Sequence, residues 1–235
     1  MPISPHFRNP QLTVKLDTDQ FMMEVEDTIL RLLGNHPRIV TYHGRDDTTG
    51  ALIFDTAPNG DVQRYLLSHS DTPLHIRAKW GFQLAEGIVY LHSKHIVWAD
   101  CNPSNLLLTS DLDILLCDFA GSSISGLPPS VCPGAVYSLP RLEWLADTNM
   151  DIFSFGCVFF GILTLQSPYA GLTLHDIRAN YDSAVFPDIP KHVPDAFALV
   201  IHKCWHLKYQ SSQELLDNMH AAYEAFCGSD ELQSA

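Results

Sequence analysis

The sequence is short of positive charge. Its 235 residues include 14 lysines and arginines against 27 aspartates and glutamates, which gives a formal net charge of −13. A field of that sign repels phosphate, so we expect no non-specific binding to nucleic acid or to anionic membrane surfaces. The balance still permits a small phosphate compound that a metal ion holds locally.

The sequence also has no closely paired cysteines and no long uninterrupted apolar run. The six cysteines show no C-x-x-C pair, and most have apolar neighbours, which is typical of core thiols in a reducing compartment. No basic segment followed by an apolar one opens the chain, so we expect no signal peptide. The apolar stretch at 152–165 is too short to cross a bilayer. We therefore expect an intracellular, cytoplasmic protein with no membrane partner.

The spacing of apolar residues predicts a small part with strands, followed by a larger helical part. Strands are expected at 12–16, 39–44 and 51–55, with a helix between 21 and 33 that Gly34 to Pro37 ends. Later helices are expected at about 76–92, 151–165, 197–206 and 213–226, and a hairpin over 106–116. The pattern favours an α+β protein.

Two short polar motifs stand out in this apolar sequence. Asp100 and Asn105 lie five residues apart around a proline, in the stretch V-W-A-D-C-N-P-S-N over 97–105. Asp118 follows an apolar run in C-D-F-A-G over 117–121, eighteen residues after Asp100. This order and spacing resemble the catalytic loop and metal-binding loop of protein kinases, H-R-D-x-x-x-x-N followed by D-F-G.

Further stretches resemble the same family in the same order, from about residue 12 to residue 226. They are 26–40, similar to the kinase αC helix and its exit; 52–60, similar to the hinge; 90–97, before the catalytic loop; 151–169, similar to the αF helix; and 204–205, a late landmark. The resemblance implies one two-lobed kinase-like domain over 1–235. Its reduced N-lobe would span 11–57, and its helical C-lobe 58–228.

The resemblance also implies roles in phosphoryl transfer from ATP with Mg²⁺. Asp100 would orient the substrate hydroxyl or accept its proton, Asn105 would hold one magnesium ion, and Asp118 would hold the ion between the β- and γ-phosphates. Glu26 would pair with a lysine that grips the α- and β-phosphates. Lys15 is the lysine that precedes Glu26, at a short spacing of 11 residues.

Four more positions resemble the part of a kinase that holds adenosine. Phe54 falls where kinases guard the back pocket, and Ala57 would offer backbone groups to adenine. Leu107 would form the floor beneath adenine, and Asp61 could reach a ribose hydroxyl. Ordinary packing and turn chemistry explain each of these residues equally well.

Two departures from the family remove groups that bind phosphate. No glycine precedes Gly34, so we expect these 235 residues to contain neither the Gly-rich loop nor the two strands that would roof the nucleotide, either because the protein starts here or because the sequence is truncated. Asn102 stands where a lysine normally neutralises the transferring phosphate. Losing one such donor costs about 10²–10³ in rate.

Other departures concern the loops around the site. Trp98 replaces the catalytic-loop His and can stack on Phe119. Ala99 removes the Arg that reads an activation-loop phosphate, and Ala135 lies near the position where Ser/Thr kinases keep a Thr that bonds the catalytic Asp. Arg141 replaces the Glu of A-P-E, and no Arg follows Trp205 to pair with it; losing both halves together is tolerated better than losing one.

Three functions stay open at this point. The first is a weak or conditional kinase acting on Ser/Thr of an unknown protein, and the second is an inactive pseudokinase that serves as a scaffold or regulatory binding module. The third is a small-molecule kinase, which the stretches at 151–156 and 204–205 disfavour because they look like the protein-kinase branch. Phosphate transfer, and its loss on mutation of Asp100 or Asp118, separates the first two.

Overall fold

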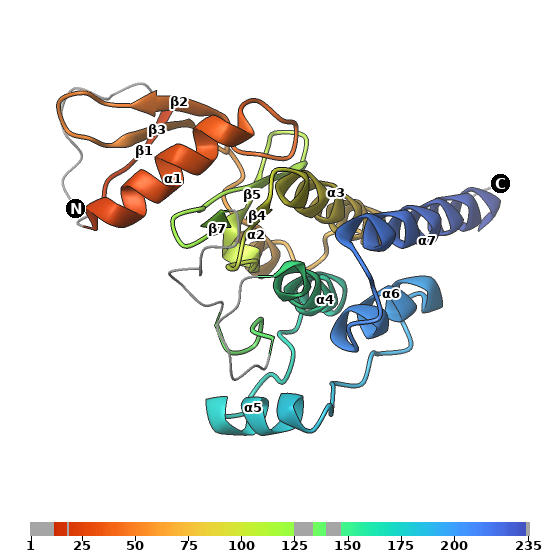
Figure 1. The fold of residues 1–235 in the computed structure, drawn as a ribbon. Helices are drawn as coiled ribbons and strands as arrows, with labels where there is room; N and C mark the ends of the chain where they lie inside the picture. Colours follow the sequence, from red (N-terminus) through yellow and green to blue (C-terminus); the bar gives the residue numbers. More distant parts are fainter. Residues whose placement is uncertain (1–11, 18, 125–133, 140–146, 234–235) are drawn as a thin grey trace.

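A small antiparallel sheet and one helix form the N-terminal part of the molecule (Figure 1). The computed structural model describes residues 12–17, 19–124, 134–139 and 147–233. The first elements are β1 (Leu12–Lys15), α1 (Gln20–Leu33), β2 (Tyr42–Arg45) and β3 (Leu52–Asp55). The strand order is β1-β3-β2, so the central strand β3 pairs with both of its sequence predecessors. The helix α1 packs along this sheet.

Both ends of α1 are fixed by local chemistry. The Asp19 carboxylate accepts a hydrogen bond from the Met22 N–H at 3.2 Å, which caps the first turn. Gly34 ends the helix with a φ of 59°, and its N–H donates to the Leu30 carbonyl at 3.0 Å. The predicted helix and its stop at Gly34 are confirmed. Its buried face consists of Met23, Glu26, Ile29, Leu30 and Leu33.

The segment before β2 belongs to the joint between the two parts of the molecule. The strand predicted at 39–44 begins only at Tyr42, because Ile39 forms a parallel bridge with Leu116 instead. The Val40 N–H donates to the Leu116 carbonyl at 3.0 Å, and the Leu116 N–H donates to the Arg38 carbonyl at 2.8 Å. These backbone bonds tie the sheet part to the helical part.

The helical part is built around a buried central helix. Its helices are α2 (Val62–Ser68), α3 (Leu74–Ser93), α4 (Thr148–Thr164), α5 (Leu174–Asp182), α6 (Asp195–Trp205) and α7 (Ser212–Gln233). The helix α4 is buried along almost its whole length, as expected of a helix that is apolar all round. A Cβ at Gly81 would lie 2.2 Å from the Phe159 ring, so α3 and α4 cross closely because that residue is glycine.

Short strands lie between α3 and α4. They are β4 (Ile96–Val97), β5 (Leu106–Leu108), β6 (Ile114–Leu116) and β7 (Ser123–Ile124), with a 3₁₀ turn η1 (Pro103–Asn105) just before β5. The antiparallel pair β5–β6 confirms the predicted hairpin.

The later helices and the α+β architecture expected from the sequence are confirmed. The helix α5 had not been expected. Only Ile177 and Tyr181 are buried in it, so its apolar periodicity is weak. The predicted start of the N-lobe at residue 11 and the prediction for Arg141 lie outside the described residues, and the lobe boundary at 57/58 stays a prediction. No helix in the described part of the chain is both long and apolar enough to cross a membrane.

Candidate active site

One lysine joins two carboxylates that come from different elements. Lys15 at the end of β1 places Nζ 2.6 Å from Glu26 Oε2 and 2.9 Å from Asp118 Oδ1. Glu26 lies on the buried face of α1, where it is 1% exposed, and its Oε1 accepts the Phe119 N–H at 3.2 Å. Glu26 therefore links the strand, the helix and the loop after β6.

The short spacing between Lys15 and Glu26 has a simple structural reason. The strand β1 ends at Lys15, and α1 begins five residues later at Gln20. Glu26 lies almost two helical turns further on, and α1 runs along the sheet, so the buried face of α1 is directed back at the end of β1.

The charges of this cluster act in opposite directions on Lys15. Burial lowers the pKa of the Lys15 ammonium, but the carboxylates of Glu26 and Asp118 raise that pKa by more, so it lies above its usual value of 10.5. Lys15 is therefore a cation at neutral pH.

The catalytic-loop pair forms a second cluster. Asn105 Nδ2 donates to the Asp100 carbonyl at 3.0 Å and to Asp100 Oδ2 at 2.9 Å. Burial raises the pKa of Asp100, and the hydrogen bonds from Asn105 and Asn102 oppose that shift. Within the described residues Asn105 Oδ1 accepts no hydrogen bond, so this oxygen remains available to a ligand.

A buried aspartate from α4 holds the start of this loop. Asp151 is fully buried and accepts the N–H groups of Trp98 at 2.8 Å and Ala99 at 2.9 Å. His92 Nε2 lies 2.8 Å from the same carboxylate. These contacts hold Ala99 at a φ of 62°, a conformation that costs energy in a residue with a Cβ. Sequence reasoning missed this role, although a lone aspartate in an apolar helix was its signal.

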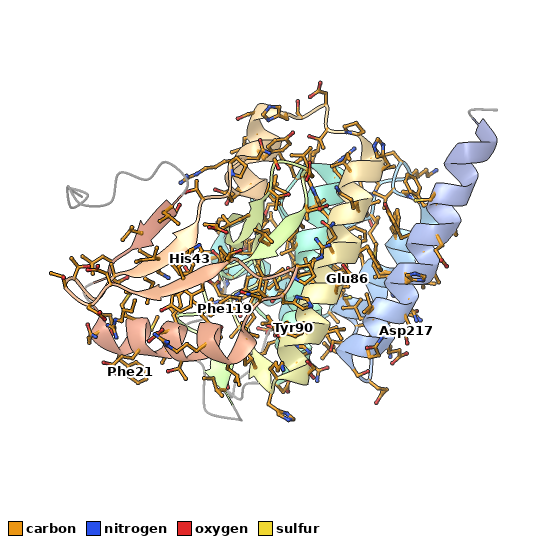
Figure 2. The ribbon with its side chains drawn as sticks, turned by 90° about the horizontal axis from the view of Figure 1, so that it is seen from above. Phe21, His43, Glu86, Tyr90, Phe119 and Asp217 are labelled. Atoms are coloured by element: carbon orange, nitrogen blue, oxygen red, sulfur yellow. The ribbon has the colours of Figure 1, made fainter. Side chains whose placement is uncertain are left out.

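Trp98 connects the catalytic loop to the metal-binding loop. Its indole Nε1 donates to the Asp118 carbonyl at 3.1 Å, and its ring lies 6.1 Å from the Phe119 ring at an angle of 37°. The expected contact between the two rings is present, with a tilted geometry. Figure 2 shows Phe119 in the middle of the molecule, between the sheet part and α3. Asp118 has a φ of 58°, which Asp tolerates better than most residues.

The residues expected around adenosine lie along β3 and β5. Phe54 is in β3 and 7% exposed, and Ala57 follows that strand. Asp61 forms an antiparallel bridge with Leu107 of β5. The Asp61 carboxylate caps α2 by accepting the Arg64 N–H at 2.9 Å, so the structure shows its turn chemistry, while contact with ribose remains a prediction.

Residues 134–139, which include Ala135, are held by hydrogen bonds from α4 and α5. Ser154 Oγ donates to the Tyr137 carbonyl at 2.6 Å, and Tyr181 Oη donates to the Val136 carbonyl at 2.6 Å. The alanine methyl itself offers no hydrogen bond to Asp100.

The oxygens at the end of the β5–β6 hairpin fit a divalent cation. Asn105 precedes β5 and Asp118 follows β6, and the Cys117 N–H donates to the Asn105 carbonyl at 3.1 Å, so both side chains emerge from the same end. Amide and carboxylate oxygens are ligands that Mg²⁺ accepts. No group of three metal-binding side chains occurs among the described residues, so substrate phosphates and water would have to complete the coordination.

Comparison with known proteins decides the family. The chain matches the protein kinase domain family over residues 9–221. It belongs to the protein kinase family. The sheet-rich first part is therefore the N-lobe of a kinase domain, and the helical part is its C-lobe. The resemblance drawn from the two polar motifs is confirmed.

Several curated relatives are similar to the chain. It is 30% identical over 224 residues to "Putative serine/threonine-protein kinase/receptor R826" of Acanthamoeba polyphaga mimivirus, covering 91% of this chain and 13% of that protein. It is 27% identical over 201 residues to cell division control protein 7 of Schizosaccharomyces pombe, covering 83% and 19%. It is 28% identical over 189 residues to the inactive tyrosine-protein kinase kin-32 of Caenorhabditis elegans, covering 74% and 21%. The chain thus spans about a fifth or less of each relative's length.

Proposed function

We propose that the chain is a slow, metal-dependent protein kinase domain that transfers the γ-phosphate of ATP to a Ser or Thr hydroxyl. The observation that carries the proposal is the position of Lys15, with Nζ within 3 Å of both Glu26 and Asp118. A protein kinase needs its strand lysine paired with the αC glutamate and its metal-loop aspartate in place at the same time. The acceptor is a protein rather than a nucleic acid, in keeping with the net charge of −13.

Each side chain has a proposed task. Lys15 contacts the α- and β-phosphates of ATP, and Glu26 holds Lys15 in place. Asp118 and Asn105 hold Mg²⁺, which when bound neutralises charge on the phosphates. Asp100 orients the acceptor hydroxyl and takes up its proton.

The reaction is proposed to be slow because the site lacks cations. The residues assigned to the site include three carboxylates, those of Glu26, Asp100 and Asp118, and Lys15 is shared by two of them. Asn102 brings no charge where a lysine would neutralise the moving phosphoryl group, a loss of about 10²–10³ in rate. A metal ion must therefore supply most of the positive charge.

A pseudokinase is the second candidate. It is favoured by the neutral Asn102. The name of one relative, an inactive tyrosine-protein kinase, shows that proteins of this similarity include inactive ones. In this case the domain binds partners without transferring phosphate.

Transfer of labelled phosphate to a degenerate library of Ser- and Thr-containing peptides tests the proposal. We expect measurable transfer by the wild-type chain and a fall of about 10²–10⁴ in Asp100→Asn, since general base catalysis contributes that much. Asp217→Asn is the matched control, because Asp217 is exposed on α7, far from the site (Figure 2). Transfer that Asp100→Asn leaves unchanged would contradict the assignment, and ATP binding without transfer would favour the pseudokinase.

A further inference from the structure

Asn102 uses both ends of its side-chain amide inside the catalytic loop. Its Nδ2 donates to the Asp100 carbonyl at 3.0 Å and to Asp100 Oδ1 at 3.1 Å. Its Oδ1 accepts the Ser104 N–H at 3.0 Å and the Ser104 hydroxyl at 2.5 Å. The side-chain amide of Asn102 thus connects Asp100 to the turn that contains Ser104.

The Asp100 carboxylate is held from both sides as a result. Asn102 donates to Oδ1 and Asn105 donates to Oδ2, so each oxygen has its own amide donor. Asn102 is also the N-cap of η1, the turn that presents Asn105. The two hydrogen-bonded links therefore close a small loop that contains Asp100, Asn102 and Asn105.

Asparagine is the side chain that meets both demands at this position. An aspartate would cap the turn equally well, because its oxygens accept N–H groups, but it has no N–H to donate and would repel Asp100. A lysine could donate to Asp100 but could not accept the Ser104 N–H. Asn102, which stands where the family usually has a lysine, therefore has a structural role of its own here.

We propose that Asn102 is a positioning residue, whose amide holds the Asp100 carboxylate and the turn carrying Asn105 as one rigid unit for phosphoryl transfer. The inference rests on the proposed function, because Asp100 is the residue whose alignment matters. Asn102 makes no hydrogen bond to Lys15, Glu26 or Asp118 in the described structure. Its loss should therefore slow the chemical step and leave ATP binding almost unchanged.

A purely structural role for Asn102 predicts a different result. If Asn102 served only as a helix cap, Asn102→Asp would behave like the wild type, since Asp and Asn cap turns about equally well. If Asn102 also aligns Asp100, Asn102→Asp must slow phosphoryl transfer although the turn stays intact. The aspartate variant thus distinguishes the role of the donating Nδ2 from that of the accepting Oδ1.

Steady-state kinetics of Asn102→Asp supply the first test. We expect kcat to fall by about 10²-fold, the loss that a misplacement of about 1 Å can cause, while KM for ATP stays within about threefold. Asn218→Asp is the control: it makes the same chemical change beside Lys203, away from the site. Unchanged kcat in Asn102→Asp, or a rise in KM with kcat kept, would overturn the proposal.

A second measurement reads the contact without requiring catalysis. In a ¹⁵N-labelled chain, the Asn102 side-chain amide protons should exchange slowly with water. Asp100→Ala removes the carboxylate acceptor, so it should shift their resonances and speed their exchange. No change in these signals would overturn the positioning role. If the signals respond but the wild type transfers no phosphate, the proposed function fails while the link between Asn102 and Asp100 stands.

Discussion

At the residue scale, the site depends on side chains that each satisfy several partners. Lys15 and Asp151 each contact two or more groups from other elements, and Asn102 bonds to Asp100 and Ser104 on either side of it in the loop. The resemblance to kinases predicted that Lys15 pairs with Glu26, and the structure places the two side chains together. The role of Asp151 as loop anchor escaped prediction, because a lone aspartate in an apolar helix does not show that its partners include the backbone N–H groups of Trp98 and Ala99.

Replacing Lys15 with methionine should weaken ATP binding at least tenfold and destabilise the fold. Burial already raises the pKa of Glu26 above its usual 4.5, although Lys15 opposes this shift. Without Lys15 the folded state binds the Glu26 proton more tightly than the unfolded chain does, so stability falls as pH rises above about 4.5. Thermal unfolding should therefore show a larger deficit for Lys15→Met at pH 8 than at pH 5.

The control for this prediction is Lys191→Met, a substitution at an exposed lysine away from the site. It should unfold like the wild type at both pH values. An equal loss of stability at pH 5 and pH 8 in Lys15→Met would mean that Glu26 does not carry an uncompensated charge.

At the element scale, α1 determines whether Glu26 reaches Lys15. The periodicity of its apolar residues predicted α1 well, because one whole face is buried. The helix is fastened on two sides: Tyr42 Oη on β2 donates to Asp27 Oδ1, and Tyr90 Oη on α3 donates to the Leu33 carbonyl, each at 2.5 Å. Neither bond could be predicted, since both join elements whose relative placement the sequence does not show. By contrast, the helix α5 is mostly exposed, so its sequence has only a weak amphipathic pattern.

Removing the Tyr42 hydroxyl should loosen α1 without unfolding the domain. A hydrogen bond to a charged group contributes about 1.5–3 kcal/mol, so Tyr42→Phe should speed amide hydrogen exchange within α1 by about tenfold or more. Tyr65→Phe is the control, because the Tyr65 hydroxyl makes no hydrogen bond within the described residues. Equal exchange in α1 of the wild type and Tyr42→Phe would show that β2 does not hold the helix.

At the scale of the whole molecule, two lobes are joined at the site. The backbone bonds between residues 38–40 and Leu116 bring β6, and with it Asp118, beside the N-lobe. The sequence predicted the order of the two lobes from a change of periodicity. It could not predict this joint, because bonds between segments more than 70 residues apart have no local signal. The joint explains how residues 15, 26 and 118 meet.

The same view makes metal dependence the central claim. The molecule has a net charge of −13, and Lys15 is shared by two carboxylates, so under the proposed function we expect ATP to bind well only when a divalent cation offsets the repulsion. The Asp118 carboxylate is the group best placed to hold that cation, since it is 45% exposed and one of its oxygens is already aligned by Lys15.

Titration of the chain with ATP, with and without Mg²⁺, tests this claim most directly, with Asp118→Asn measured alongside. Asparagine preserves the size of the side chain and removes its charge. We predict binding that depends on Mg²⁺ and falls at least tenfold in Asp118→Asn, with little binding to either protein when the metal is withheld. ATP binding of equal strength with and without Mg²⁺, unaffected by Asp118→Asn, would contradict the account.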